Sequence, residues 1–238
     1  MAFKEIPTGR LADYVMEQLK EAIFQGRYQA GERLPPENKL VEIFGVSRVV
    51  VREAIRNLEN SGLIQIKRGP AGGAFALPMS HKSVTHVLRD ALRLGKAKVA
   101  HIMEVRLDIE PLVAGMAARR RTDEDIELLS QSLAPAPESS SHEYLAWNVD
   151  FHRLVAKACH NPVYEILVNI LMDFTQELLL KIKPPELVVH DTVSHPAVFE
   201  RIKRGDAQGA SKRYREHLLD IAPMLQKLEN NLPNKLFS

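Results

Sequence analysis

Residues 34–73 show two helical hydrophobic patterns followed by an alternating one. In the first predicted helix, one apolar face is formed by Leu40, Ile43 and Phe44. Gly45 tolerates the left-handed backbone of a tight turn, and Ser47 is a favourable N-cap for the next helix. The predicted buried face of that second helix consists of Val51, Ala54, Ile55 and Leu58. The pattern therefore predicts two helices joined by a short turn.

The segment after the second helix predicts a strand and a basic turn. Residues 63–66 (Leu-Ile-Gln-Ile) alternate, and residues 67–69 (Lys-Arg-Gly) add charge at a turn that suits a wing beside the minor groove. The second helix exposes Arg48, Arg52 and Arg56. Helix-turn-helix proteins place the N-terminal part of this helix in the major groove, where arginine can bind guanine or phosphate. We therefore predict a winged helix-turn-helix domain that binds double-stranded operator DNA.

The predicted DNA contacts are divided between phosphates and base edges. We assign Asn38 and Ser47 to phosphates, and Arg48 and Arg52 to base edges. Exposed arginines are commonly just solvated, so the prediction depends on their combination with an N-cap serine and a basic Gly-containing turn. The full predicted set is Asn38, Ser47, Arg48, Val49, Arg52, Lys67, Arg68 and Gly69.

From residue 81 onward, turn signals are rare and helical periods dominate. The predicted helices cover about 81–95, 100–120, 122–133, 140–159, 162–182, 186–205 and 206–229. Thr122 is a favourable N-cap for the third of them, and residues 134–137 (Ala-Pro-Ala-Pro) predict a loop. The fold class is therefore mainly α, with a winged helix-turn-helix domain over residues 1–78 and an all-α bundle of six or seven helices over residues 79–238.

Composition changes this picture only locally. The formal net charge is +2, which does not indicate a polyanionic partner for the whole chain. Residues 47–68, however, carry five basic side chains (Arg48, Arg52, Arg56, Lys67, Arg68) against two acidic ones (Glu53, Glu59), enough for phosphate contacts. The single cysteine, Cys159, excludes a disulfide within the chain and favours a cytoplasmic location. No apolar run reaches membrane-spanning length, so no membrane association is expected.

Four polar residues in the second domain form a candidate metal site. Asn148 and His152 are four residues apart, so they project from one face of an otherwise apolar helix. His195 and His217 lie in the two predicted helices that follow residue 185, each flanked by core-type residues. Three imidazoles in one cavity suit Zn²⁺ or Ni²⁺, with the Asn148 oxygen as a weak neutral ligand. A single histidine on an apolar face is more often a hydrogen-bonded core residue, so both interpretations stand.

Several motifs are similar to those of a known family. The segments Gly26-Arg27-Tyr28, 31–37 (GERLPPE), 45–48 (GVSR) and 51–55 (VREAI) resemble the GntR family of bacterial transcription regulators. Residues 148–153 (NVDFHR) and 194–199 (SHPAVF) resemble the FCD effector domain of its FadR subfamily. This resemblance implies a homodimer whose repression is relieved by a ligand. It also implies a metal held by three histidines and an aspartate, but Asn148 stands where that aspartate is usual.

The resemblance extends to the effector. Residues 104–111 (EVRLDIEP) resemble the FCD segment whose arginine, here Arg106, faces the effector cavity. A guanidinium matches a carboxylate bidentately, which favours a small organic acid such as a hydroxy acid, sugar acid or dicarboxylate. The alternative is that Arg106 pairs with Glu110, four residues on. Asn169 and Asp173 lie among apolar residues of the same domain and are further candidates for effector binding.

Taken together, these observations predict a ligand-responsive DNA-binding regulator rather than an enzyme. The alternative function is a metal-dependent hydrolase or isomerase with an accessory DNA-binding domain. The chain has no Gly-rich phosphate loop and no nucleophile elbow, and no carboxylate is identifiable as a general base. The attached DNA-binding module favours sensing over catalysis.

Overall fold

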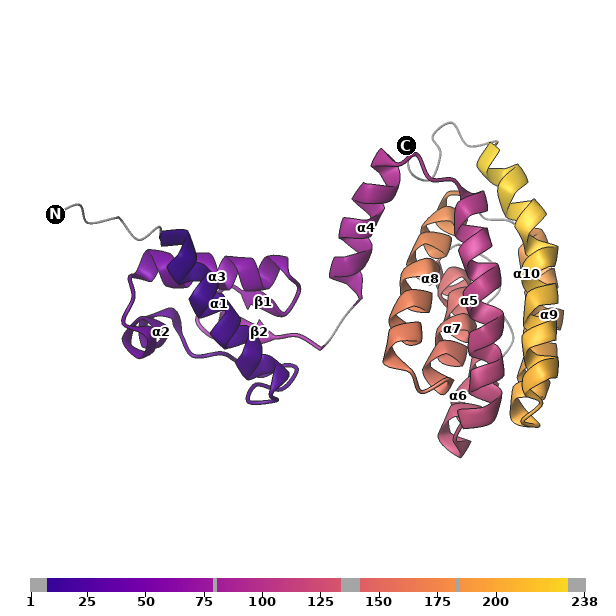
Figure 1. Cartoon of the computed structure of the whole chain (residues 1–238), viewed down its shortest axis with the longest axis horizontal. Coiled ribbons are helices and arrows are strands. Elements are labelled where there is room, and N and C mark those ends of the chain that lie inside the picture. The colour runs from indigo at the N-terminus through magenta and orange to yellow at the C-terminus, as the bar shows by residue number, and fades with distance from the viewer. Residues whose placement is uncertain (1–7, 79–80, 134–141, 183–184, 231–238) are drawn as a thin grey trace. The chain divides into compact units, whose positions relative to one another are not determined.

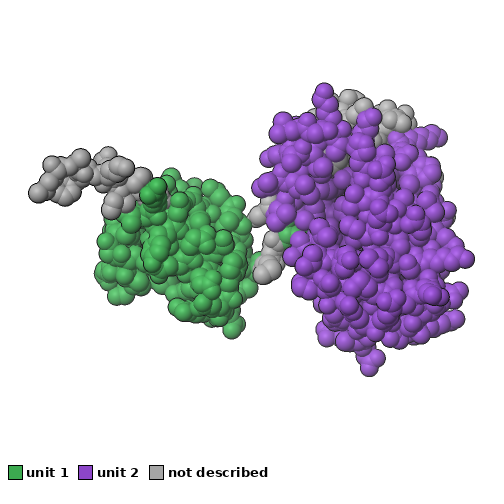
Figure 2. All heavy atoms as spheres, in the orientation of Figure 1, with its two compact units in different colours: residues 1–83 green, residues 84–238 purple. Residues whose placement is uncertain are grey.

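The chain folds into two compact units, residues 1–83 and 84–238, coloured separately in Figure 2. The computed structural model describes residues 8–78, 81–133, 142–182 and 185–230. The predicted domain boundary at 78/79 adjoins residues 79–80, and the predicted loop at 134–137 falls in the second gap. Both therefore lie at or outside the edges of the described residues and stay predictions.

The first unit combines helices with a two-stranded sheet (Figure 1). Its elements are α1 (Thr8–Phe24), α2 (Glu37–Phe44), α3 (Arg48–Asn60), β1 (Ile64–Lys67) and β2 (Gly73–Ala76). Helix α3 packs against α1, α2 and β1, and it contributes the centre of a small apolar core. Its buried side chains include all four that the helical period predicts: Val51, Ala54, Ile55 and Leu58.

The two strands form an antiparallel hairpin that extends outward from the core. The register pairs Ile64 with Ala76 at one end and Lys67 with Gly73 at the other. Ile64 and Ala76 are buried, whereas Lys67 and the turn residues beyond it are exposed. The hairpin is therefore anchored at its base and free at its tip, which is the geometry of a wing. An isolated antiparallel β-bridge between Arg33 and Phe75 pairs a third segment of the chain with β2.

The predicted apolar face of α2 is wrong at one position. Leu40 is buried and Phe44 is half-buried, but Ile43 is 58% exposed. Helix α2 has only eight residues and packs on α3 along one side. Val41 joins Leu40 and Phe44 in the core. Ile43 lies at the edge of this narrow buried face because a single helical contact covers too few positions to bury every apolar residue.

The second unit is all-α, as the sequence predicts. Its described elements are α4 (Lys82–Leu94), α5 (Val99–Arg120), α6 (Asp123–Ser132), α7 (His142–Ala158), α8 (Pro162–Ile182), α9 (Pro185–Lys203) and α10 (Ala207–Asn230) (Figure 1). Helix α5 is central, because it packs against α7, α8, α9 and α10. The largest contact is between α5 and α10. The core of this unit lies between these helices and is built mainly from aliphatic side chains.

A glycine allows α5 and α10 to approach closely. A Cβ atom on Gly115 would lie 3.1 Å from the backbone oxygen of Ala207, at the start of α10. Helix crossings that bring backbones this near require small side chains at the contact. Further along the same pair of helices, Tyr214 of α10 reaches Glu110 of α5. The close crossing therefore helps to place the polar residues described below.

Thr122 caps α6 in the way its position predicts. Its hydroxyl accepts a hydrogen bond from the Asp125 backbone nitrogen at 3.2 Å, while Asp125 Oδ2 accepts from the Thr122 nitrogen at 2.8 Å. His160 also contacts the same carboxylate, with its Nε2 2.7 Å from Oδ2. Burial raises the pKa of Asp125, but the hydrogen bonds from Thr122 and His160 lower it more, so the pKa lies below its ordinary value.

Replacing Thr122 with alanine should lower the free energy of unfolding of the helical unit by about 1 kcal/mol, because one N-cap bond and one partner of Asp125 are lost. Thr122→Ser keeps the hydroxyl and is the matched control. The measurement is urea-induced unfolding followed by circular dichroism. Equal stability of Thr122→Ala and the control would show that water replaces the cap at no cost.

Candidate DNA-binding surface and metal site

The turn before α3 has the geometry that the sequence predicts. Gly45 adopts φ 63°, in the left-handed region, and its backbone N–H bonds to the Val41 oxygen to close α2. Ser47 is the N-cap of α3, and its side chain accepts from the Val50 nitrogen at 3.4 Å. The helix-turn-helix is thus built by local backbone preferences, and the turn directs the first residues of α3 outward.

The first turn of α3 is exposed and chemically suited to DNA. Arg48 and Arg52 are exposed, and Val49 is 69% exposed, although most valines are buried. An exposed valine beside arginines can contact a thymine methyl group. Arg52 Nε lies 2.9 Å from Glu37 Oε2 of α2. Because both side chains are largely exposed, this ion pair is weak and does not prevent Arg52 from binding DNA.

The remaining predicted DNA contacts are also on the surface. Asn38 is exposed on α2, and Lys67, Arg68 and Gly69 are exposed at the wing. Gly69 has φ 106°, a conformation that favours glycine. Lys67 Nζ lies 4.7 Å from the centre of the Phe75 ring, which holds the lysine stem along the hairpin. The structure brings no sequence-predicted DNA contact into the core of the unit.

The three predicted histidines meet inside the second unit. His152 comes from α7, His195 from α9 and His217 from α10, and all three are buried. Their ring centres are separated by 5.0 Å (152–195), 5.3 Å (152–217) and 4.9 Å (195–217). Three imidazoles bound tetrahedrally to one zinc ion would have ring centres about 5 Å apart. The spacing of the rings therefore matches that of a three-histidine metal site.

Hydrogen bonds hold one nitrogen of His152 and leave the other for a ligand. Its Nδ1 lies 2.9 Å from Glu110 Oε2 and 2.5 Å from the Tyr214 hydroxyl, which itself donates to Glu110 Oε2 at 2.7 Å. This arrangement assigns the Nδ1 proton to the carboxylate and leaves the lone pair on Nε2. Metal-binding histidines in proteins commonly have such a carboxylate partner on the second nitrogen.

Glu110 links this group to a buried arginine. Arg106 Nε donates to Glu110 Oε1 at 2.5 Å and Nη2 donates to Oε2 at 3.4 Å. Burial raises the pKa of the Glu110 carboxyl, but the charge of Arg106 and the hydrogen bond from His152 lower it more, to about 2. Glu110 is therefore ionised at neutral pH. Burial likewise raises the pKa of Tyr214, and the Glu110 charge raises it further, so this hydroxyl keeps its proton.

The other two histidines present buried nitrogens without hydrogen-bond partners. Both ring nitrogens of His195 and the Nε2 of His217 are buried and make no hydrogen bond within the described residues. His217 Nδ1 lies 2.9 Å from the Ser194 hydroxyl, and His195 stacks on Phe151 with ring centres 4.3 Å apart. Burial lowers the pKa of His195 and of His217 well below the ordinary value, as do the neighbouring histidines. Unpartnered neutral imidazoles are suited to a divalent metal ion.

Asn148, the fourth predicted metal ligand, is hydrogen-bonded to a carboxylate of the protein. The Asn148 amide nitrogen donates a hydrogen bond to Oδ2 of Asp191, a buried residue of α9. Four further residues lie close to the three predicted histidines, and the sequence assigned none of them to the metal site. They are Glu110, His190, Asp191 and Tyr214. A signal existed for Asp191, because it precedes His195 by four residues, the same helical spacing that links Asn148 to His152.

The predicted effector contacts are only partly brought together. Arg106 is buried beside the histidines, but it pairs with Glu110, the alternative that the spacing also allowed. Asn169 is half-buried on α8. Asp173 accepts from Arg153 at 2.8 Å and from the Thr85 hydroxyl at 3.0 Å, so it is already engaged within the unit. Sequence spacing placed these residues on helices correctly but did not reveal their partners.

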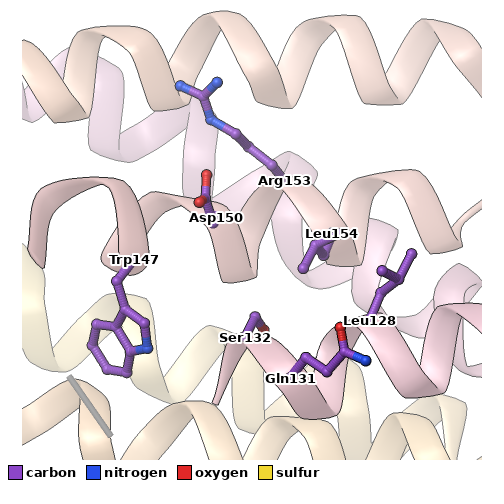
Figure 3. A pocket seen from close by; sticks show the side chains of 7 residues that line it. All are labelled: Leu128, Gln131, Ser132, Trp147, Asp150, Arg153 and Leu154. Carbon is purple, nitrogen blue, oxygen red and sulfur yellow. The ribbon is translucent and has the colours of Figure 1, made fainter. Parts of the chain in front are cut away.

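A hollow of about 330 Å³ lies between α6 and α7 (Figure 3). It is lined by Leu128, Gln131, Ser132, Trp147, Asp150, Arg153 and Leu154. Its α7 residues are on the opposite face of the helix from Asn148 and His152, as helical geometry requires. Trp147 lies at the boundary between the two regions, with its ring centre 6.0 Å from that of His195. The hollow is therefore a separate feature from the histidine cluster.

Within the described ranges, no helix is long and apolar enough to cross a membrane.

Comparison with known proteins finds a matching family for each of the two units. Residues 11–72 match the bacterial regulatory proteins of the gntR family, and residues 101–220 match the FCD domain. The transcriptional repressor NanR of Enterobacter sp. (strain 638) is 30% identical over 224 residues, covering 90% of this chain and 84% of that protein. NanR of Escherichia coli (strain K12 / DH10B) is 29% identical over the same length. The solved structure of a Streptococcus agalactiae GntR protein shares the fold, with a TM-score of 0.70, 22% identity and coverage of 89% and 99% of the two chains. The chain belongs to the GntR family of bacterial regulatory proteins, in its FadR subfamily with an FCD domain.

Proposed function

We propose that this DNA-binding regulator is a repressor, released from its operator when a small carboxylate binds a divalent metal ion in the helical domain. The observation that carries the proposal is the meeting of three buried histidines, two of which, His195 and His217, hold buried ring nitrogens without hydrogen-bond partners within the described residues. The same chain exposes a recognition helix and a wing. Its NanR relatives are described as transcriptional repressors, which supports repression as the sign of regulation.

His152, His195 and His217 would hold the metal ion, and the donor set suits zinc or nickel. When bound, the ion supplies a Lewis-acidic position for an oxygen of the effector carboxylate. Glu110 and Tyr214 keep the His152 ring oriented and its Nδ1 protonated, so that Nε2 faces the ion.

The role of Arg106 follows from its partner. Its guanidinium is bonded to Glu110, so an external carboxylate would have to compete with an internal one. We propose that Arg106 holds Glu110 in place and adds positive charge near the effector, while the metal makes the direct contact. Asn169 remains a proposed lining residue of the effector site. Asp173 remains one as well, with its carboxylate oriented by hydrogen bonds from Arg153 and Thr85.

On the DNA side, Arg48 and Arg52 would read base edges and Val49 would contact a methyl group. Asn38, Ser47 and the wing residues Lys67, Arg68 and Gly69 would bind the backbone. A homodimer would present two such surfaces to a palindromic operator in the cytoplasm. Effector binding would shift the population towards a dimer geometry that fits the two half-sites poorly.

A metal-dependent hydrolase or isomerase is the alternative. Membership of a family of regulators does not favour it. The two functions differ in a measurable way, since an enzyme would convert the acid and a sensor would return it unchanged.

The test combines DNA binding with ligand binding. The full-length protein, with its metal content measured, first selects DNA from a random pool. Hydroxy acids, sugar acids and dicarboxylates are then screened for their effect on its melting temperature, with and without a chelator, because a ligand of the native state raises that temperature. An acid that stabilises the metal-loaded protein should also weaken operator binding, by the reciprocal coupling of linked sites.

Loss of the stabilisation upon chelation, together with release of the operator, supports the proposal. Stabilisation that survives chelation would remove the metal from effector binding and leave Arg106 as the anchor. Conversion of the acid by the purified protein would favour the enzyme instead. Operator affinity that no acid changes would contradict the sensing role.

A further inference from the structure

Asp191 is a buried carboxylate beside two of the three histidines, His195 and His217. Its Oδ1 lies 3.7 Å from His195 Nε2 and 3.9 Å from His217 Nδ1. Two ligand atoms of one tetrahedral zinc ion lie about 3.4 Å apart, since each bond to nitrogen or oxygen is roughly 2.1 Å long. The Asp191 oxygen is therefore placed, relative to His195, almost as a second ligand of the same ion would be.

Asn148 is oriented towards this carboxylate. Its amide nitrogen donates to Asp191 Oδ2, the oxygen that is not near His195, and both side chains are buried. The hydrogen bond fixes the carboxylate and leaves Oδ1 to face the histidines. His190, which is half-buried, holds Nδ1 at 3.3 Å from the same Oδ1. Asn148 thus orients Asp191 through the N–H of its amide. An ionised aspartate at position 148 would lack this donor.

The charges around the histidines are consistent with a ligand role for Asp191. Glu110, the other buried carboxylate nearby, is bonded to Arg106 and holds the outer nitrogen of His152. A divalent ion in a low-dielectric core is favoured by an anionic ligand, whereas an amide oxygen is neutral. Asp191 can supply that negative charge at 3.7 Å from His195 Nε2.

We propose that Asp191 is the anionic metal ligand of this site, and that Asn148 is a positioning residue that orients it. The inference rests on the metal site of the proposed function and changes its ligand set. The carboxylate is supplied by α9 in place of α7, at the same four-residue spacing from a histidine. The set becomes His152, His195, His217 and Asp191.

The test is competition for Zn²⁺ between the full-length protein and a chromophoric chelator. Asp191→Asn should weaken zinc binding by at least about 100-fold, the upper end of what losing an outer-sphere partner costs. Asn148→Ala should weaken it by only about tenfold, because the ligand itself remains. Asp150→Asn removes a similar charge from the exposed face of α7 and should change nothing. Circular dichroism checks that each variant is folded.

A double variant tests the position of the charge. Asn148→Asp with Asp191→Asn exchanges the two side chains across the hydrogen bond and returns a carboxylate to α7. Because residue 148 bonds to Oδ2, the Asp191 oxygen that does not face His195, the exchanged carboxylate would lie outside the metal sphere, and the exchange should not recover the affinity lost in Asp191→Asn. Recovery of most of that affinity would show that residue 148 itself can face the ion, and would overturn its assignment as a positioning residue. Asn148→Ala keeps the Asp191 carboxylate, so it still tests the proposal if Asp191→Asn does not fold.

The two possible failures can be told apart. If the wild type and His152→Ala bind zinc equally weakly, the metal site itself is wrong. If the wild type binds zinc and Asp191→Asn binds it as well as Asp150→Asn does, only the role of Asp191 is overturned. A larger loss in Asn148→Ala than in Asp191→Asn would make Asn148 the ligand.

Discussion

Replacing Glu110 with glutamine should lower the free energy of unfolding of the helical domain by about 3 kcal/mol or more. Glutamine has the same shape, so the change removes only the negative charge that pairs with Arg106. Arg106 is itself buried, and its charge would then lack a counter-charge at 2.5 Å. A buried charge without a partner costs more than the intact pair contributes. Chemical denaturation of the metal-free protein measures the effect without interference from ligand binding.

The control for this prediction is a double variant. Arg106→Met with Glu110→Gln removes both charges and should recover most of the lost stability, because paired buried charges can often be replaced at little cost. If Glu110→Gln alone were nearly neutral, the Arg106 guanidinium would have to reach water in the folded state. That result would contradict the buried pair and would favour an Arg106 that is available to an effector.

Replacing Arg48 with alanine should weaken binding to the selected operator by roughly 5-fold to 150-fold, or about 1–3 kcal/mol. Arg48 is the first residue of α3 and is exposed, where recognition helices contact base edges. Loss of a bidentate contact removes discrimination at one base pair, so the preferred sequence should relax there. Fluorescence anisotropy with the operator and with point-substituted operators measures both effects.

Arg56→Ala is the matched control, because Arg56 is exposed on the same helix two turns further along. It is too distant from the first turn to read the same base pair, so its loss should weaken binding to all sequences alike, or not at all. An Arg48→Ala variant that keeps the wild-type sequence preference would limit Arg48 to phosphate binding. In that case Arg52 would be the remaining arginine to test for base reading.

The helix-turn-helix could be predicted because its determinants are local. The N-cap at Ser47, the left-handed glycine at Gly45 and the helical period of α3 each depend on a few neighbouring residues, and the structure confirms them. Ile43 is the exception, and it is instructive. Its apolar character indicates burial, but burial depends on how much of α2 is covered by α3, and a helical period does not contain that information.

The histidine cluster was only partly predictable. Spacing places Asn148 and His152 on one face of a helix, and the resemblance to FCD domains adds His195 and His217. The partners of these residues come from other helices: Glu110 from α5, Tyr214 from α10 and Asp191 from α9. Such contacts depend on helix crossings, one of which requires Gly115 at the approach of α5 and α10. Their pairing therefore could not be inferred from spacing along any single helix.

By itself, the sequence determined the order of the elements, the division into a winged helix-turn-helix and a helical bundle, and the residue types at both candidate sites. These depend on periodicity, caps and turns, which act over a few residues. Only the tertiary structure decided that Arg106 is paired with Glu110, that Asn148 bonds to Asp191, and which nitrogens of the histidines are left without hydrogen-bond partners. The reason is physical: in a buried site, the partner and the charge state of each polar group are set by neighbours that packing brings together from distant parts of the chain.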